Sequence, residues 1–167
     1  MLQFGYPADE YADNGNWSPQ LYIREARRMV GEYVMTQANC QGRSIVKDGI
    51  GRAAYGMDSH NCQRVVVNGM AKNEGDVQVG GFPPYPVSYR SILPRRKECI
   101  NLLVPVCLSA SHIAYGSIRM EPVFMVLSQA AATAAMMSID GHKPLHRLDV
   151  RALDKKITDA ALFHGNN

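Results

Sequence analysis

The segment 109–120 gathers side chains that could do chemistry. It holds one histidine, one arginine, one tyrosine and three serines. The apolar run 102–106 before it predicts a buried strand, and the polar segment itself predicts a loop. Glu121 and Pro122 after it suit the first turn of a helix, because a negative charge faces the positive helix end and the first N–H groups need no partner. Residues 123–137 are apolar or small, so we predict a buried helix.

A strand, a polar loop and a helix N-terminus in this order can hold an anion or a polarised ring. The free N–H groups and the helix dipole then point at the ligand. Five alanines in the predicted helix would also let another backbone or a flat cofactor approach closely. Taken alone, however, these residues favour a core helix packed on a sheet, without a ligand.

A second candidate is the pair Asp58 and His60. The two side chains would point to the same side of an extended segment. A carboxylate beside an imidazole fixes its tautomer and raises its basicity, so His60 is a candidate acid or base. The alternative is that both are ordinary turn residues.

A third candidate is Arg90, which follows Tyr89 in the run 84–94. A buried arginine offers a planar fork that suits a carboxylate or a sugar oxygen. The alternative is an ion pair between domains.

Two further patterns do not predict ligand sites. Residues 49–54 spell G-x-G-x-x-A, but no strong strand precedes them and no good helix follows, so we predict a strand or bulged loop rather than a dinucleotide site. The four cysteines lack zinc spacing, and His142 and His146 are separated by Pro144. We therefore predict no metal site, and we expect the cysteines to be reduced.

The remaining elements must position these candidates. Ser18 and Pro19 suit a helix start, with apolar residues at helical spacing to Tyr33 and a possible pair between Arg28 and Glu32. Residues 63–68 and 76–79 predict strands, and 80–86 predict a rigid loop. Asp149 predicts the cap of a last helix that extends to about residue 162. The pattern is that of a mixed α and β fold, α/β or α+β.

Composition narrows the function classes. The net charge is +3, with 18 basic and 15 acidic residues, so no strong field for nucleic acid exists. The predicted helix after Pro122 approaches membrane-spanning length, but polar residues lie in its middle and no basic flanks accompany it. No signal peptide is visible. These features predict a soluble chain that does not span a membrane.

The segment 109–135, S-A-S-H-I-A-Y-G-S-I-R-M-E-P-V-F-M-V-L-S-Q-A-A-A-T-A-A, resembles the C-terminal signature of a family of FAD-dependent oxidoreductases. Some relatives in that family, bacterial proteins among them, are labelled xanthan lyases. The runs D-S-H at 58–60 and Y-P-V-S-Y-R-S-I-L-P at 85–94 resemble family segments too. Ser128 stands where the family usually has glycine, and Ser88 where it has proline.

The resemblance implies a division of the chain and a fragment of a larger protein. Residues 1–17 would be a loop, 18–95 part of a β-rich substrate region, and 96–167 the closing strand and helices of an FAD-binding domain. That domain would be incomplete, because no strand–glycine–helix unit for the FAD pyrophosphate is visible. We therefore expect a missing N-terminal FAD-binding segment as partner, and no FAD binding by this chain alone.

The resemblance also implies roles for individual residues. The parent would transfer a hydride between an organic substrate, such as a carbohydrate, and FAD. The N–H groups near Ser117 to Met120 would stabilise negative charge on the reduced flavin, and Arg119 would add a cation there. His60 or His112 would be the acid or base, and Arg90 would hold the substrate. The cofactor-binding set is then Gly116, Ser117, Ile118, Arg119 and Met120.

Two alternatives remain open. A polysaccharide lyase would use Tyr89 or His60 as the base and Arg90 to neutralise a uronate carboxylate. The chain could instead be an inactive piece that self-associates as a homodimer through exposed apolar surface.

Overall fold

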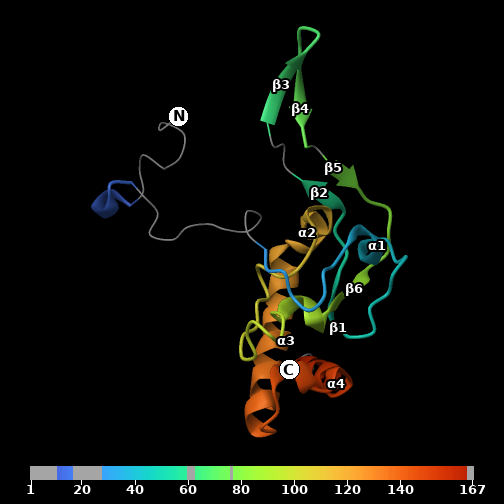
Figure 1. Ribbon diagram of the computed structural model, residues 1–167, viewed down its shortest axis with the longest axis vertical. Helices are drawn as coiled ribbons and strands as arrows, with labels where there is room; N and C mark the ends of the chain where they lie inside the picture. Colours follow the sequence, from blue (N-terminus) through green and yellow to red (C-terminus); the bar gives the residue numbers. More distant parts are fainter. Residues whose placement is uncertain (1–10, 17–27, 60–62, 76, 165–167) are drawn as a thin grey trace.

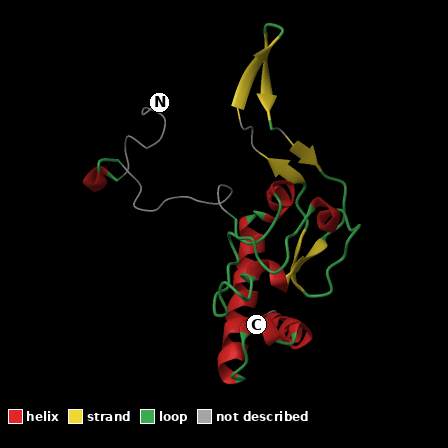
Figure 2. Ribbon diagram, in the orientation of Figure 1, coloured by secondary structure: helices red, strands yellow, loops and turns green. Residues whose placement is uncertain are grey.

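The computed structural model describes residues 11–16, 28–59, 63–75 and 77–164. Helices and small antiparallel sheets are mixed in it (Figure 1 and Figure 2), which confirms the mixed α and β composition. In chain order the elements are η2 (Ala12–Asn14), α1 (Gln37–Cys40), β1 (Gly49–Ala53), β2 (Met57–Ser59), β3 (Gln63–Val67), β4 (Met70–Glu74), β5 (Val77–Val79), β6 (Tyr85–Ser88), η3 (Tyr89–Ile92), α2 (His112–Ile118), α3 (Glu121–Asp140), η4 (Leu145–Arg147) and α4 (Val150–His164).

One apolar core joins residues from Met35 to Leu153. Helix α3 is its longest element, and it packs against β1, η4 and α4. Helix α2 packs against β2 and α1. In Figure 1, α4 lies beside the lower half of α3, while α2 lies near its upper end, next to β2. The elements that carry the candidate residues therefore share one core with the C-terminal helices.

Strand β1 contains the G-x-G-x-x-A pattern and pairs antiparallel with β6. The register shifts between Gly49 and Arg52, so the expected strand with a bulge is confirmed. A Cβ added at Gly49 would lie 2.8 Å from Pro86, and one at Gly51 would lie 2.6 Å from a methyl group of Val126 on α3. The glycines thus permit close packing of β1 against β6 and α3, not the approach of a dinucleotide.

The strands β3 and β4 form an antiparallel hairpin. Asn68 and Gly69 join them, with positive φ angles of 53° and 74°, as a two-residue hairpin turn requires. We predicted the strand before this turn, but not β4, whose lysine, asparagine and glutamate resemble a polar loop. In Figure 1 the hairpin extends away from the helices.

The predicted buried strand at 102–106 is wrong. The segment has no strand assignment, and Leu102 and Val106 are both exposed. Its backbone meets the 3-10 helix η3 through the N–H of Val104, which donates to the carbonyl of Ile92 at 2.9 Å. Pro105 lacks an N–H and so cannot donate to a neighbouring strand. The prediction was based on the apolar run alone and did not take this into account.

The predicted helix from Ser18 to Tyr33 lies partly outside the described residues, which resume at Arg28. From there to Tyr33 the chain is not helical, and Gly31 forms a bridge with Pro94. The pairing of Arg28 with Glu32 is therefore wrong, because it requires helical spacing. The guanidinium of Arg28 instead lies 5.5 Å from the centre of the Tyr115 ring.

Helix α3 confirms the helix after Glu121 and corrects its burial. Pro122 occupies the first turn, as expected. Only one face is buried, through Val123, Phe124, Leu127, Ala130, Ala131 and Ala134, while Met125, Met136 and Ile139 are exposed. By length and composition α3 is the one helix of the described residues that could cross a membrane. It packs its buried face on the core, as helices of non-membrane proteins also do.

Helix α4 confirms the predicted last helix and its cap. The carboxylate of Asp149 accepts hydrogen bonds from the N–H groups of Arg151 and Ala152, at 2.9 and 3.4 Å. Leu153 is fully buried and Ile157 packs against the core, so this face anchors the helix beside α3.

Candidate functional site

Most of the predicted cofactor residues lie on α2, where we expected a loop. That prediction is wrong because Ser111 caps a helix: its hydroxyl accepts from the N–H of Ala114 at 3.4 Å. The side chains from Ala114 to Arg119 are buried. The polar residues of this segment thus face the interior, and the helix fixes their positions relative to β2 and β6.

Gly116 brings α2 into direct contact with the backbone of β2. A Cβ added at Gly116 would overlap the carbonyl oxygen of Asp58 and lie 3.1 Å from its carbonyl carbon. No side chain other than hydrogen fits between the two backbones. The contact places Asp58 beside the end of α2.

Arg119, immediately after α2, is buried and pairs with Asp58. One guanidinium nitrogen lies 3.6 Å from a carboxylate oxygen of Asp58 and donates to its backbone carbonyl at 3.3 Å. The Asp58 side chain is about one-third exposed, whereas that of Arg119 is almost fully buried. A cation at the end of α2 is therefore held next to a carboxylate that reaches solvent.

Two buried hydroxyl groups link β6 and α2 to Tyr55, in the segment that leads into β2. The Tyr85 hydroxyl donates to the Ser117 hydroxyl at 2.6 Å, and Ser117 donates to the backbone carbonyl of Tyr55. Burial, together with contact with the Cys40 thiol, raises the pKa of Tyr85, so its hydroxyl keeps its proton. Ser117 is thus engaged within the protein, and it holds the segment that leads into β2.

A pocket of about 300 Å³ opens beside this cluster. Asp58 and Gln78, which face each other in the register of β2 and β5, contribute polar groups to it. The Tyr55 side chain is about half exposed at its edge. The lining consists of Tyr55, Gly56, Met57, Asp58, Gln78, Val79 and Gly80. Carboxylate, amide and aromatic groups around one opening suit a ligand that carries hydroxyl groups.

The N–H groups that we expected to face a flavin are only partly accessible. The N–H of Arg119 donates to Tyr115 and that of Met120 to Ile118. At the start of α3, Pro122 has no N–H, and the N–H groups of Val123 and Phe124 donate to the carbonyl of Met120 at 2.9 and 3.1 Å. The positive end of the helix dipole is what this turn offers to a ligand. The two parts of FAD, its flavin ring and its pyrophosphate, differ in how well this site matches them. Arg119 and the positive end of the α3 dipole have the sign of charge that favours a reduced flavin ring, whereas the strand β1 provides no cradle for the pyrophosphate.

Of the two candidate histidines, only His112 lies within the described residues. His112 is the first residue of α2 and is exposed. His60 lies outside the described residues, although Ser59 before it ends β2 in the extended conformation that we expected. The relation of the histidines to Asp58 and the pocket remains a prediction.

Tyr89 and Arg90 contact a different group of residues. The Tyr89 hydroxyl is buried and donates to the carbonyl of Leu145 at 3.1 Å, and burial raises its pKa to about 12. A role in holding substrate led us to expect a buried Arg90, but its side chain is half exposed. Its guanidinium donates to both carboxylate oxygens of Asp48, at 2.9 and 3.3 Å. It also lies over the Tyr33 ring. Arg90 therefore forms an ion pair, but with a residue of the same predicted region, 18–95, and not across the predicted domain boundary.

The pair of Asp48 and Arg90 should stabilise the fold in a pH-dependent way. Burial raises the pKa of Asp48, but hydrogen bonds from Arg90 and Ser88 outweigh it and leave the pKa below the ordinary 3.8. Its stabilisation is therefore complete above that value and disappears as the pH falls through the lowered pKa. In a double-mutant cycle with Asp48→Asn and Arg90→Met we expect a coupling of about 1 kcal/mol at neutral pH, since solvent screens the exposed side of the pair.

Urea denaturation of the four proteins at neutral and acid pH measures this coupling. A coupling that persists unchanged in acid would contradict the assignment to the Asp48 carboxylate.

Sequence reasoning missed two residues of this site, Gln78 and Tyr85, and the partner of a third, Asp58. Asp58 was considered as a partner of His60, not of Arg119, because the contact spans 61 positions. Gln78 could have been found, since it alternates with two valines on a short strand and so belongs to its polar face. Tyr85 lies among prolines and was assigned to a loop, which concealed its buried hydroxyl.

A family model described as FAD dependent oxidoreductase matches residues 1–157 of the chain. No curated protein and no solved structure gives a significant match.

Proposed function

The chain belongs to the family of FAD dependent oxidoreductases, and from this membership we propose that it forms the flavin-ring and substrate side of a hydride-transfer site. The observation that carries the proposal is the position of Arg119, buried between the end of α2 and the start of α3 beside Asp58. FAD, when bound, takes up the hydride and supplies the redox chemistry. The residues of this chain would place the ring and the substrate.

We propose that Arg119 and the N-terminus of α3 face the flavin ring. A buried guanidinium and a helix N-terminus both favour negative charge, and such charge develops on a reduced flavin. Gly116 and Ser117 would serve as support, because one allows α2 to contact β2 and the other bonds to Tyr55. The pyrophosphate would be held by residues outside those described, in an N-terminal FAD-binding segment.

We propose that the substrate is an organic molecule with several hydroxyl groups, such as a carbohydrate, in the pocket between β2 and β5. Asp58 and Gln78 can accept and donate hydrogen bonds there, and the exposed Tyr55 ring can stack on an apolar face. Oxidation of a hydroxyl carbon releases a proton as well as a hydride. His60 or His112 would take that proton on a ring nitrogen.

The histidine roles are tested with His60→Ala and His112→Ala in a flavin-loaded form of the protein. We expect substrate-dependent flavin reduction under anaerobic conditions to slow by about 10²-fold or more in one of them, since general acid–base catalysis contributes that much. The fold should be unaffected, because His112 is exposed. His142→Asn, beyond the far end of α3, is the matched control. Unchanged reduction in both alanine variants would remove the histidines from the mechanism.

The lyase alternative gains no support from these contacts. Tyr89 is buried and its hydroxyl is engaged, and its raised pKa keeps that hydroxyl protonated, so it is not poised to accept a proton. Arg90 is already paired with Asp48 and would have to exchange that carboxylate for a uronate. The flavin proposal is therefore the one we develop.

The exposed apolar face of α3 supports a proposal about association. Met125 is 73% exposed, and Met136 and Ile139 are exposed on the same side of the helix, about three to four turns further along it. We propose that this face packs on the FAD-binding segment. Without that segment, two copies of the chain would pair through the same face. Light scattering should show a dimer for the chain and a monomer for Met125→Glu/Met136→Glu. A monomeric unchanged chain would contradict this proposal.

A further inference from the structure

A second pocket lies away from the candidate site, between an extended segment and a basic turn. Its volume is about 530 Å³, and the lining residues are Gly31, Glu32, Val34, Arg95, Arg96 and Lys97. None of these residues belongs to the set assigned to flavin or substrate above.

Backbone contacts fix the two sides of this pocket. Gly31 forms an antiparallel bridge with Pro94, and the N–H of Glu32 donates to the carbonyl of Leu93 at 3.0 Å. A Cβ at Gly31 would overlap the Leu93 oxygen, so the close approach depends on glycine. The turn itself is closed by the N–H groups of Glu98 and Cys99, which donate to Arg95. The pocket is therefore part of the fold and not a chance gap between side chains.

The single carboxylate in the lining is already engaged. Glu32 accepts a hydrogen bond from the backbone N–H of Arg96 at 2.5 Å. The Nε2 atom of His146 lies 3.9 Å from the same carboxylate oxygen and 2.9 Å from the carbonyl of Pro94. Glu32 thus accepts a hydrogen bond from the backbone of the turn and lies near a histidine ring, and its charge offsets part of the charge of the basic side chains.

The three basic side chains remain available to a ligand. Arg95, Arg96 and Lys97 are all exposed, and within the described part of the chain no carboxylate lies in ion-pairing range of them. Glu98 follows them and is exposed too, so it offsets part of their charge. With three cations and one engaged carboxylate, the lining is electropositive. Guanidinium forks bind oxyanions in a bidentate manner, and a nearby ammonium adds a point charge.

We propose that this pocket binds a small molecule through an oxyanion group, a phosphate or a carboxylate. The pocket is large enough for such a group together with the rest of a metabolite-sized ligand. Arg95, Arg96 and Lys97 supply the charge, while Glu32 holds the turn in the shape that presents them. The proposal goes beyond the flavin site and does not depend on it.

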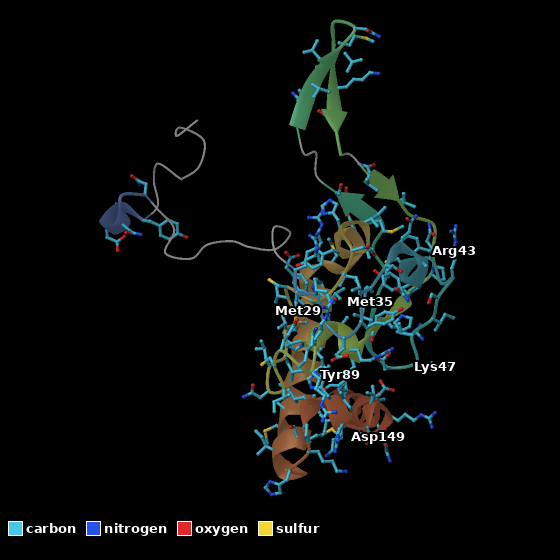
Figure 3. All side chains as sticks on the ribbon, viewed as in Figure 1. Met29, Met35, Arg43, Lys47, Tyr89 and Asp149 are labelled. Atoms are coloured by element: carbon cyan, nitrogen blue, oxygen red, sulfur yellow. The ribbon has the colours of Figure 1, made fainter. Side chains whose placement is uncertain are left out.

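Calorimetric titration of the complete chain tests this site. Inorganic pyrophosphate represents the phosphate source, glucuronate represents the carboxylate source, and glucose is the neutral comparison. The variant Arg95→Ala/Lys97→Ala removes two charges from the pocket. The control Arg43→Ala/Lys47→Ala removes two charges from the exposed loop between α1 and β1 (Figure 3) and so changes the net charge equally.

We expect saturable binding of pyrophosphate or glucuronate, but not of glucose, and the anion that binds identifies the source. The pocket variant should bind it about tenfold more weakly, equivalent to ~1.4 kcal/mol, while the control stays within about twofold. Because the altered side chains are exposed, the variant should fold normally. The proposal is overturned if neither anion saturates the chain, or if both double variants lose the same affinity, since the effect would then be general charge.

Discussion

Replacement of Gly116 with alanine is expected to destabilise the protein by about 2–3 kcal/mol. Alanine ordinarily favours a helix over glycine by about 1 kcal/mol, so propensity alone predicts the opposite sign. The added Cβ, however, would overlap the backbone oxygen of Asp58. Backbone atoms of a paired strand cannot move aside as a flexible side chain can. The contact between α2 and β2 must therefore open.

The measurement is urea denaturation of Gly116→Ala beside Gly80→Ala. A Cβ at Gly80 would meet nothing within 4 Å, so that variant is the matched control and should change stability by less than about 0.5 kcal/mol. Gly116→Ala should also shift the resonances of β2 residues, because α2 would no longer approach it. A neutral or stabilising Gly116→Ala would show that α2 and β2 are not in contact.

Truncation of Leu127 to alanine is expected to cost about 3–4 kcal/mol of stability. Leu127 is fully buried on α3, and one of its methyl carbons would lie 3.7 Å from a Cβ built at Gly51. The cavity left behind is bordered by β1, which pairs with β6 and cannot collapse into it freely. The loss should therefore approach the full transfer and cavity cost.

Met125→Ala on the same helix is the matched comparison for Leu127→Ala. Met125 is exposed, so its truncation should change stability by less than about 0.5 kcal/mol in the monomer. Denaturation of both variants at low protein concentration separates stability from association. Equal losses in the two variants would mean that α3 is buried all round, as the sequence predicted.

Elements that depend on local chemistry could be predicted from the sequence. The helix after Pro122, the cap at Asp149 and the strand over the G-x-G-x-x-A pattern each depend on local chemistry, and each was predicted. Burial of α3 on one face could not be read from its sequence, because exposed and buried residues of this helix are equally apolar.

The contacts of the candidate site were harder to predict, because they join distant segments. Ser109 to Arg119 read as a polar loop, yet Ser111 caps a helix whose polar side chains turn inward. Arg119 pairs with Asp58, which is 61 positions away in the sequence, and Arg90 pairs with Asp48, which is 42 positions away. No periodicity encodes such pairs. The family resemblance pointed to the segment 109–135, but the partners of its residues became visible only in the fold.

Flavin titration of this chain, followed by fluorescence, tests the central claim that it supplies the ring side of the site without a pyrophosphate cradle. The account predicts weak binding, in which riboflavin and FAD differ by less than about threefold and Arg119→Met weakens both. The titration uses the Arg95→Ala/Lys97→Ala variant throughout, so that the basic pocket does not contribute. FAD binding more than about thirtyfold tighter than riboflavin would contradict the account, because it would reveal a pyrophosphate cradle within this chain. Failure of both flavins to bind would contradict the assignment of the ring to Arg119 and α3.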